Sequence, residues 1–309
     1  MAGLIHIQSS PEYVAAVSSA NSVIVTDLSL RPLIELPGFP EGSVSGSAFS
    51  PSSPNLLATI SEDSSFIQLF DLRSSPDPIS KLKTSPGASL CSIAFHPSQP
   101  CLSVGTSTGT ILLSSLHNPT RPVRDFPFLH TDTVTSLYHL PCNDLILSGS
   151  VDGLVNLFNP ELSEDDCIVN VLDAESAVCK LGVVDSFIWT TTLTETFSVW
   201  DVSSSTPVEP VVSSKNPREV LGVDYLLDIY SINNEIIVFG GSHQGDLKVS
   251  PLSNVNNSIV LKPFIETIRS MCFNQFSRGF YFCSEDRGLS FGAFQEGKFK
   301  QSRTVSVNI

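Results

Sequence analysis

The sequence predicts an all-β fold, a seven-bladed β-propeller in which each blade is a sheet of four antiparallel strands. Short apolar segments alternate with turn residues along the chain, and no helical periodicity of any length occurs. One unit also recurs at intervals of 44, 44, 44, 42, 50 and 42 residues, measured between Asp27, Asp71, Ser115, Asn159, Asp201, Pro251 and Ala293. A propeller blade has a period of about 40 to 45 residues, and we expect seven of them to close a ring that leaves no sheet edge of any length exposed.

The repeats extend through the whole chain of 309 residues, so we expect one domain over residues 1–309 rather than two. The blades are predicted over residues 3–36, 45–82, 89–126, 133–172, 177–212, 226–262 and 267–305. The second and third strands of a blade face other blades on both sides and must be apolar nearly throughout. The segments 56–60, 145–149 and 235–241 have this character.

Turn chemistry explains the residues between the second and third strands. These tight turns need a positive φ, which predicts that role for Asn21, Gly109, Gly153, Gly245 and Gly288. Serine is frequent at the ends of the second strands, where we expect its hydroxyl to satisfy backbone groups. The prolines fall mainly in connections, where no ladder N–H is required.

The stretch from His130 to Asn159 has the most complete blade pattern and resembles one WD40-type unit. In such a unit a His, a Ser or Thr, an Asp and a Trp form a buried hydrogen-bonded set. The resemblance assigns this structural network to His130, Ser148 and Asp152, with Phe158 in the place of the Trp. The network then ends one donor short.

Beyond the single unit, the chain resembles the WD repeat-containing protein 89 family. The likeness rests on residues 130–141 and 145–159, the acidic insert 164–166, and the segments 174–180, 218–220, 235–247, 266–274 and 282–289. It covers blades four to seven better than blades one to three. The family has no well-established activity. The resemblance therefore implies the fold, a WD40-type propeller, and only the general role of an interaction module.

Composition limits the partners. The chain has 17 Lys and Arg against 31 Asp and Glu, a formal charge of -14. This balance argues against direct binding of nucleic acid or an anionic membrane, since both need a cationic surface. No secretory signal or run of 18 apolar residues is present, so we expect a cytoplasmic or nuclear protein. Seven cysteines without a C-x-x-C pair predict buried thiols, and six scattered histidines offer no zinc spacing.

Catalytic motifs are not apparent, and we expect no enzyme activity and no cofactor. Residues 292–298 match the G-x-x-x-x-G-K pattern of a phosphate loop, but Phe299 replaces the hydroxyl residue that holds Mg²⁺, and no helix is predicted to follow. The acid pairs Glu62 with Asp63 and Glu285 with Asp286 lie in predicted turns without a partner acid at hydrolase spacing.

Acidic residues gather at one predicted rim, because second-to-third-strand turns and connections between blades share one end of a propeller. We expect a basic protein or peptide to bind there. The predicted rim residues are Glu62, Asp63, Asp132, Asp152, Glu195, Glu285, Asp286 and Arg287, with His243 and Lys215 also diluting the charge. Glu161, Glu164, Asp165 and Asp166 form a second acidic patch on the opposite rim.

A different function is suggested by residues 70–73, Phe-Asp-Leu-Arg at the end of a third strand. They are similar to the W-D-x-R box of propellers that serve as substrate receptors of cullin-RING ubiquitin ligases, in which Asp and Arg contact an adaptor. The likeness implies that role for Asp71 and Arg73. Our first interpretation is a non-enzymatic scaffold, monomeric within a larger complex, and the receptor is the alternative.

Overall fold

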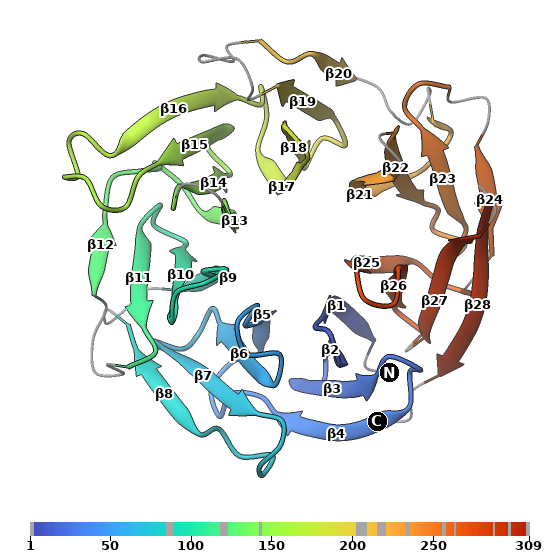
Figure 1. Ribbon diagram of the computed structural model, residues 1–309, viewed down its shortest axis with the longest axis horizontal. Helices are drawn as coiled ribbons and strands as arrows, with labels where there is room; N and C mark the ends of the chain where they lie inside the picture. Colours follow the sequence, from blue (N-terminus) through green and yellow to red (C-terminus); the bar gives the residue numbers. More distant parts are fainter. Residues whose placement is uncertain are drawn as a thin grey trace.

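The computed structural model describes residues 3–84, 89–117, 123–141, 144–201, 209–214, 221–232, 235–254, 258–262, 264–286, 288–295 and 298–306. They form seven four-stranded antiparallel sheets arranged as a ring around a central channel (Figure 1). The predicted fold is confirmed. Among the residues described, no helix is long and apolar enough to cross a membrane.

The first four blades follow one another in the sequence. Blade one contains β1 (Leu4–Ser9), β2 (Tyr13–Ser18), β3 (Ser22–Asp27) and β4 (Pro32–Pro37). Blade two contains β5 (Val44–Phe49), β6 (Leu56–Ser61), β7 (Phe66–Asp71) and β8 (Ser80–Lys83). Blade three contains β9 (Leu90–Phe95), β10 (Cys101–Thr106), β11 (Ile111–Ser115) and β12 (Arg124–Phe126). Blade four contains β13 (Val134–His139), β14 (Ile146–Ser150), β15 (Leu154–Phe158) and β16 (Ile168–Asp173).

The last three blades repeat the same order, from the channel outward. Blade five contains β17 (Val178–Val184), β18 (Phe187–Thr192), β19 (Phe197–Asp201) and β20 (Val212–Ser214). Blade six contains β21 (Tyr225–Ile232), β22 (Glu235–Gly241), β23 (Leu247–Pro251) and β24 (Ile259–Leu261). Blade seven contains β25 (Ile268–Asn274), β26 (Gly279–Ser284), β27 (Gly288–Gln295) and β28 (Lys298–Ser306). The fourth strand of blade five begins only at Val212, the last residue of the predicted segment, because Pro210 cannot donate to a ladder; residues 206–208 of that segment lie outside the described residues.

A hydroxyl residue at the end of the second strand, or just after it, holds the following turn in every blade. In blade four, the N–H of Asp152 donates to Ser150 Oγ at 3.1 Å, and in blade five the N–H of Thr196 donates to Thr192 Oγ1 at 3.2 Å. The residues in this position are Ser18, Ser61, Thr106, Ser150, Thr192, Ser242 and Ser284. The repeat therefore preserves the acceptor that each turn requires.

The turns contain most of the predicted positive φ angles. Asn21, Gly109, Gly153 and Gly245 have φ values of 62°, 80°, 87° and 80°. The prediction for Gly288 is wrong, because this residue begins β27 and a Cβ there would collide with the ring of Phe264. Close approach, not backbone conformation, explains that glycine.

Seven buried apolar clusters hold the ring together, one at each junction between neighbouring blades. The junction of blades four and five, for example, packs Leu147 and Val155 against Ile188 and the fully buried Trp200. Each blade thus buries both of its faces, which is why its middle strands are apolar in sequence.

The last blade meets the first without exchanging a strand. Leu4, Ile7 and Ile24 of blade one pack with Tyr281 and Leu289 of blade seven. Hydrogen bonds reinforce this packing: Asn274 Nδ2 donates to Ser10 O at 2.6 Å, and Tyr281 Oη donates to Leu28 O at 2.8 Å. Ring closure depends on side-chain packing and these contacts.

Two expectations need correction. The described thiols are free, but Cys91, Cys101 and Cys179 are only partly buried, because they lie on strands that border the channel or a blade end. Cys142 lies outside the described residues. The expectation that no sheet edge is exposed is wrong, because the fourth strand of every blade pairs on one side only among the described residues.

Replacing Trp200 by Ala is expected to lower the free energy of unfolding by about 3 to 5 kcal/mol, because it opens a cavity at the junction of blades four and five. Phe128→Ala is the control, since this ring is 89% exposed, and its effect should stay within about 0.5 kcal/mol. Denaturant unfolding of both variants measures the difference. Equal destabilisation by the two would contradict the assignment of Trp200 to the interblade core.

Candidate functional site

The top face is the end of the ring formed by the turns between second and third strands and by the connections between blades. The structure places Glu62, Asp63, Asp132, Asp152, Glu195, Glu285 and Asp286 in these segments. Arg287 and Lys215 lie outside the described residues. The predicted carboxylates therefore share one end of the propeller, but they differ in what they do there.

Three of the predicted acids hold the backbone. Asp152 accepts the N–H groups of Thr131 and Leu154, both at 3.0 Å, and its side chain is 8% exposed. Glu195 Oε2 accepts the N–H of Leu226 in the next blade at 2.8 Å. Asp286 accepts the N–H groups of Gly288 and Ile265 and the hydroxyl of Ser284. These carboxylates are structural, which turn composition alone does not reveal.

Cations neutralise two further positions on this face. Arg269 forms an ion pair with Glu285, one of the predicted residues. Lys262 pairs with Asp246 in blade six, its Nζ 3.2 Å from Oδ1. The acidic character of the top face is therefore weaker around blades six and seven than the sequence suggested.

One group of exposed acids on the top face lies at blade two. Glu62 and Asp63 lie in the β6–β7 turn, and Asp63 packs against Gly42, whose φ is 83°. This contact brings Glu41, in the connection from blade one, to the same place. All three carboxylates are exposed, and no described residue forms an ion pair with them. We call Glu41, Glu62 and Asp63 the blade-two cluster.

The predicted network of blade four is present. His130 Nδ1 lies 3.0 Å from Asp152 Oδ2, and His130 Nε2 lies 2.8 Å from Ser148 Oγ. The carboxylate can only accept, so Nδ1 carries the proton and Nε2 accepts from the serine hydroxyl. Phe158 is fully buried beside it, in the position assigned to Trp. Asn156, which the sequence analysis missed, adds a bond from Nδ2 to Leu129 O.

Electrostatics agree with a structural role for this pair. Burial lowers the pKa of His130, and the neighbouring Asp152 opposes that shift without cancelling it. Burial acts to raise the pKa of Asp152, but the hydrogen bonds from Thr131 and Leu154 and the contact with His130 outweigh it and lower the pKa. A neutral histidine bound to a carboxylate fixes the β14–β15 turn against the connection from blade three.

Replacing Asp152 by Ala is expected to lower the free energy of unfolding by about 3 kcal/mol, because it leaves two backbone N–H groups and a buried imidazole N–H without an acceptor. Asp63→Ala removes an exposed carboxylate from an equivalent turn and should change stability by no more than about 0.5 kcal/mol. Parallel denaturation curves measure both. A loss at Asp63 as large as that at Asp152 would refute the distinction between structural and exposed acids.

The bottom face, at the other end of the ring, carries Asp71 and Arg73. They form a bidentate pair, with Arg73 Nε 3.0 Å from Asp71 Oδ1 and Nη2 2.7 Å from Oδ2. The hydrogen bond from Arg73 lowers the pKa of Asp71 to about 2. The Arg73 side chain is 65% exposed, so the pair is accessible, and the adaptor-binding interpretation stays a prediction.

Two histidines of the bottom face meet between blades three and four, although they are far apart in sequence. The rings of His96 and His139 are 5.2 Å apart, edge to face. His96 Nδ1 accepts the N–H groups of Ser98 and Gln99, and its Nε2 lies 3.0 Å from Asp144 Oδ1. No group of three or more potential metal ligands occurs among the residues described, so the pair is a packing contact.

Burial, with a smaller contribution from His96, lowers the pKa of His139 from 6.5 to about 4. The unfolded chain therefore binds this proton first as the pH falls, and the free energy of unfolding should decrease from pH 6.5 toward pH 4. His139→Gln is expected to reduce that slope by up to about 1.4 kcal/mol per pH unit. The exposed His117→Gln is the control. Unfolding curves across this range that keep the wild-type slope in His139→Gln would contradict the shift.

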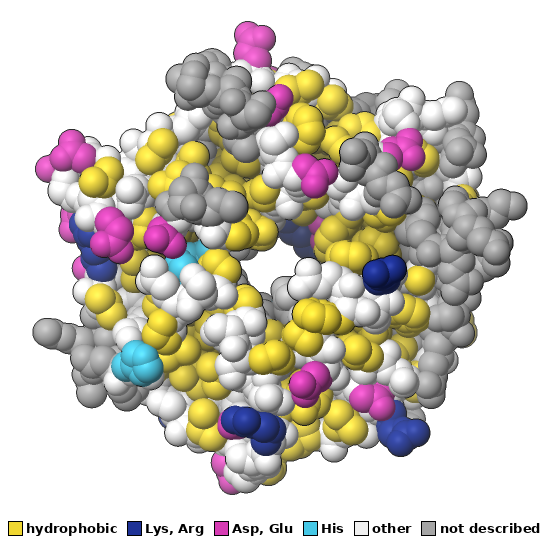
Figure 2. Space-filling view, in the orientation of Figure 1, with side chains coloured by type: hydrophobic (Ala, Val, Ile, Leu, Met, Phe, Trp, Pro, Cys, Tyr) yellow, Lys and Arg dark blue, Asp and Glu magenta, His cyan; other side chains and the backbone are white. Residues whose placement is uncertain are grey.

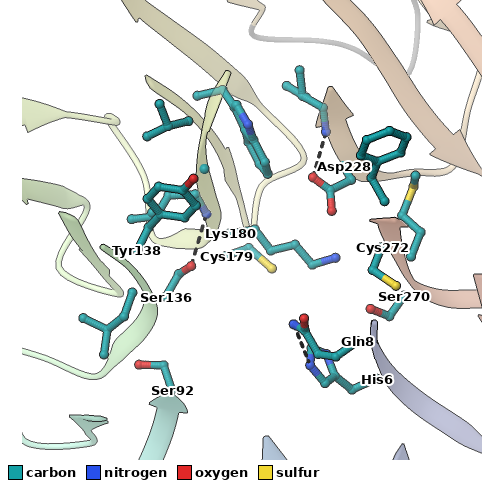
Figure 3. Close-up of a pocket in the computed structure, with 18 of the residues that line it drawn as sticks. His6, Gln8, Ser92, Ser136, Tyr138, Cys179, Lys180, Asp228, Ser270 and Cys272 are labelled. Atoms are coloured by element: carbon teal, nitrogen blue, oxygen red, sulfur yellow. Dashed lines mark hydrogen bonds between the residues drawn. The ribbon is translucent and has the colours of Figure 1, made fainter. Parts of the chain in front are cut away.

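The first strands of the blades line a central cavity of about 880 Å³. Figure 2 shows the channel opening at one face, with hydrophobic side chains around its mouth. Inside, the side chain of Lys180 on β17 extends toward β21, the strand that carries Asp228 (Figure 3). Its Nζ donates to Leu227 O at 2.9 Å and joins blades five and six. The sequence signal for this contact is a lysine inside the otherwise apolar strand β17, but the backbone carbonyl that accepts its bond has none.

The channel groups are not arranged for nucleophilic chemistry. Burial raises the pKa of Cys272 to about 12 and that of Cys91 to about 11, so both thiols stay protonated. Burial also raises the pKa of Asp228 to about 6, with Lys180 opposing the shift, and its oxygens accept the N–H of Ile229 and the hydroxyl of Tyr230. These groups hold the inner strands in place.

Comparisons with known proteins agree with the architecture. The WD domain, G-beta repeat family matches residues 121–159, the region of the best-preserved blade. WD repeat-containing protein 89 homolog of Dictyostelium discoideum is 26% identical over 170 residues, 48% of this chain and 47% of that protein. WD repeat-containing protein GTS1 of Arabidopsis thaliana is 28% identical over 221 residues, 67% of this chain and 55% of that protein.

A third relative, polyadenylation factor subunit 2 of Eremothecium gossypii, is 29% identical over 115 residues, 36% of this chain and 25% of that protein. The matched region spans about half the length of the first two relatives. Seven four-stranded blades, the His130 network and these similarities together support a WD40-type β-propeller that resembles the WD repeat-containing protein 89 family.

Proposed function

We propose that this propeller is a non-enzymatic scaffold whose top face binds a basic protein segment through the blade-two cluster. WD40-repeat propellers generally act as protein-interaction scaffolds, and they are generally non-enzymatic. The observation that carries the finer proposal is the exposure of Glu41, Glu62 and Asp63 side by side without a cation among the described residues. Three clustered carboxylates favour Lys- or Arg-rich segments.

The blade-two cluster lies near the channel mouth. Burial raises the pKa of Cys91 on the channel wall, and the charge of Glu62 contributes to that shift. Asp132, exposed in the connection between blades three and four, adds a further carboxylate to the same face. A basic segment crossing the top face would therefore contact more than one blade, which favours an extended partner over a single side chain.

The test is a charge reversal, Glu41→Lys, Glu62→Lys and Asp63→Lys together, compared with Glu12→Lys, Asp77→Lys and Asp125→Lys. Both triple variants change the net charge equally, and all six residues are exposed. A fluorescent oligolysine peptide serves as the probe. We expect the first variant to weaken binding at least tenfold and the control to change it less than threefold. Equal weakening by both would reduce the interaction to net charge and refute a localised site.

A further inference from the structure

The outermost strand of blade four, β16, differs from the other outer strands in how its free edge is protected. Natural sheets shield free edges with short strands, proline or charged residues. Here β4 has Pro32 and Pro37 at its two ends, and β8 has Lys81 and Lys83. The strands β12, β20 and β24 are only 3 residues long, and the sequence of β28 contains Lys298, Lys300 and Arg303.

Of these devices, β16 has only one charged residue, Asp173 at its end. It is 6 residues long, with the sequence IVNVLD, and contains neither proline nor a basic residue. Its β-branched side chains are exposed rather than packed: Ile168 is 45% exposed, Val169 55% and Val171 44%. Because Val169, Val171 and Asp173 alternate along the strand, their side chains share the solvent-facing side.

The backbone of β16 is free on its outer side. Asn170 lies opposite Leu157 and Leu172 opposite Val155, and the N–H of Ala174 donates to Gly153 O at 2.9 Å, so residues 170, 172 and 174 direct their ladder bonds toward β15. Nearer the start of the strand the register shifts, and Val169 has no partner on β15. Val171 and Asp173 then point their N–H and C=O groups outward. Among the described residues, the N–H of Val171 is occupied only by the side chain of its neighbour, Asn170 Oδ1, at 2.8 Å. Figure 1 shows β16 at the outer circumference of the ring.

A fixed acidic loop adjoins the beginning of this strand. Arg124 donates to the carbonyls of Pro160 and Leu162 and ties the loop to blade three. The loop then presents Glu164, Asp165 and Asp166, all exposed, directly before β16. A strand added to this edge would have one end beside three carboxylates.

We propose that β16 is a docking edge for an extended segment of a partner protein, which adds a fifth antiparallel strand to blade four. Ladder bonds to Val171 and Asp173 provide the affinity, and apolar side chains on the segment cover Val169 and Val171. In an antiparallel pair the C-terminal end of the segment lies beside the start of β16, so basic residues there would face Glu164, Asp165 and Asp166. This site is separate from the blade-two cluster.

The probe is a short synthetic peptide of alternating valine and threonine that ends in two lysines, measured by fluorescence anisotropy with the full chain. Val171→Pro removes an outward N–H without touching the β15 ladder, and Val169→Lys with Val171→Lys is a second variant that keeps every N–H. We expect each to weaken binding at least tenfold. Val260→Lys, at an exposed position of the outer strand β24, is the control and should change binding less than twofold.

Three further arms separate the alternatives. Moving the lysines to the N-terminus of the peptide should weaken binding about as much as Glu164→Gln, Asp165→Asn and Asp166→Asn together. The variant with Glu41, Glu62 and Asp63 reversed to Lys should still bind this peptide. If that variant lost binding while the β16 variants kept it, the edge proposal alone would be overturned. Failure of the wild-type chain to bind the peptide would also overturn the edge proposal. So would a wild-type dimer that Val171→Pro abolishes, because the edge would then pair two copies of this chain.

Discussion

The packing of each blade against both of its neighbours is the constraint on which the rest of this molecule depends. A four-stranded sheet with two apolar faces has no stable place in water alone, and the ring gives each face a partner. This requirement explains why β14 is buried throughout and why β22 is buried over most of its length. It also restricts polar variation to the turns, the connections and the outer strands, which are the surfaces available for binding.

The carboxylates of those turns serve two different purposes. Asp152 and Glu195 accept backbone N–H groups and join segments that come from different blades. Glu62 and Asp63 occupy an equivalent turn in blade two, where their side chains remain exposed. Some of the acidic residues that the sequence places in these turns are therefore structural, and the others are exposed at the surface.

The sequence was sufficient to predict the blades and their order, because these depend on apolar alternation and on turn residues that recur at a fixed spacing. The His130 network followed from the resemblance of residues 130–159 to a WD40-type unit. The sequence was insufficient to separate Asp152 from Asp63, since both read as acids in tight turns and only tertiary contacts distinguish them. The bond of Lys180 to Leu227 and the contact of His96 with His139 join residues of different blades. The repeat period indicates neither contact, because the residue that each side chain meets depends on how adjacent blades are rotated.

The closure between blades one and seven has a consequence for the behaviour of the whole ring. Every other pair of neighbouring blades is also linked by the peptide chain, whereas this seam is joined only by the cluster around Leu4, Tyr281 and Leu289 and by a few hydrogen bonds. Failure of the seam would turn the closed ring into an open arc with an uncovered apolar face at each end. Such an arc would expose apolar surfaces that favour self-association while most of its blades were still folded.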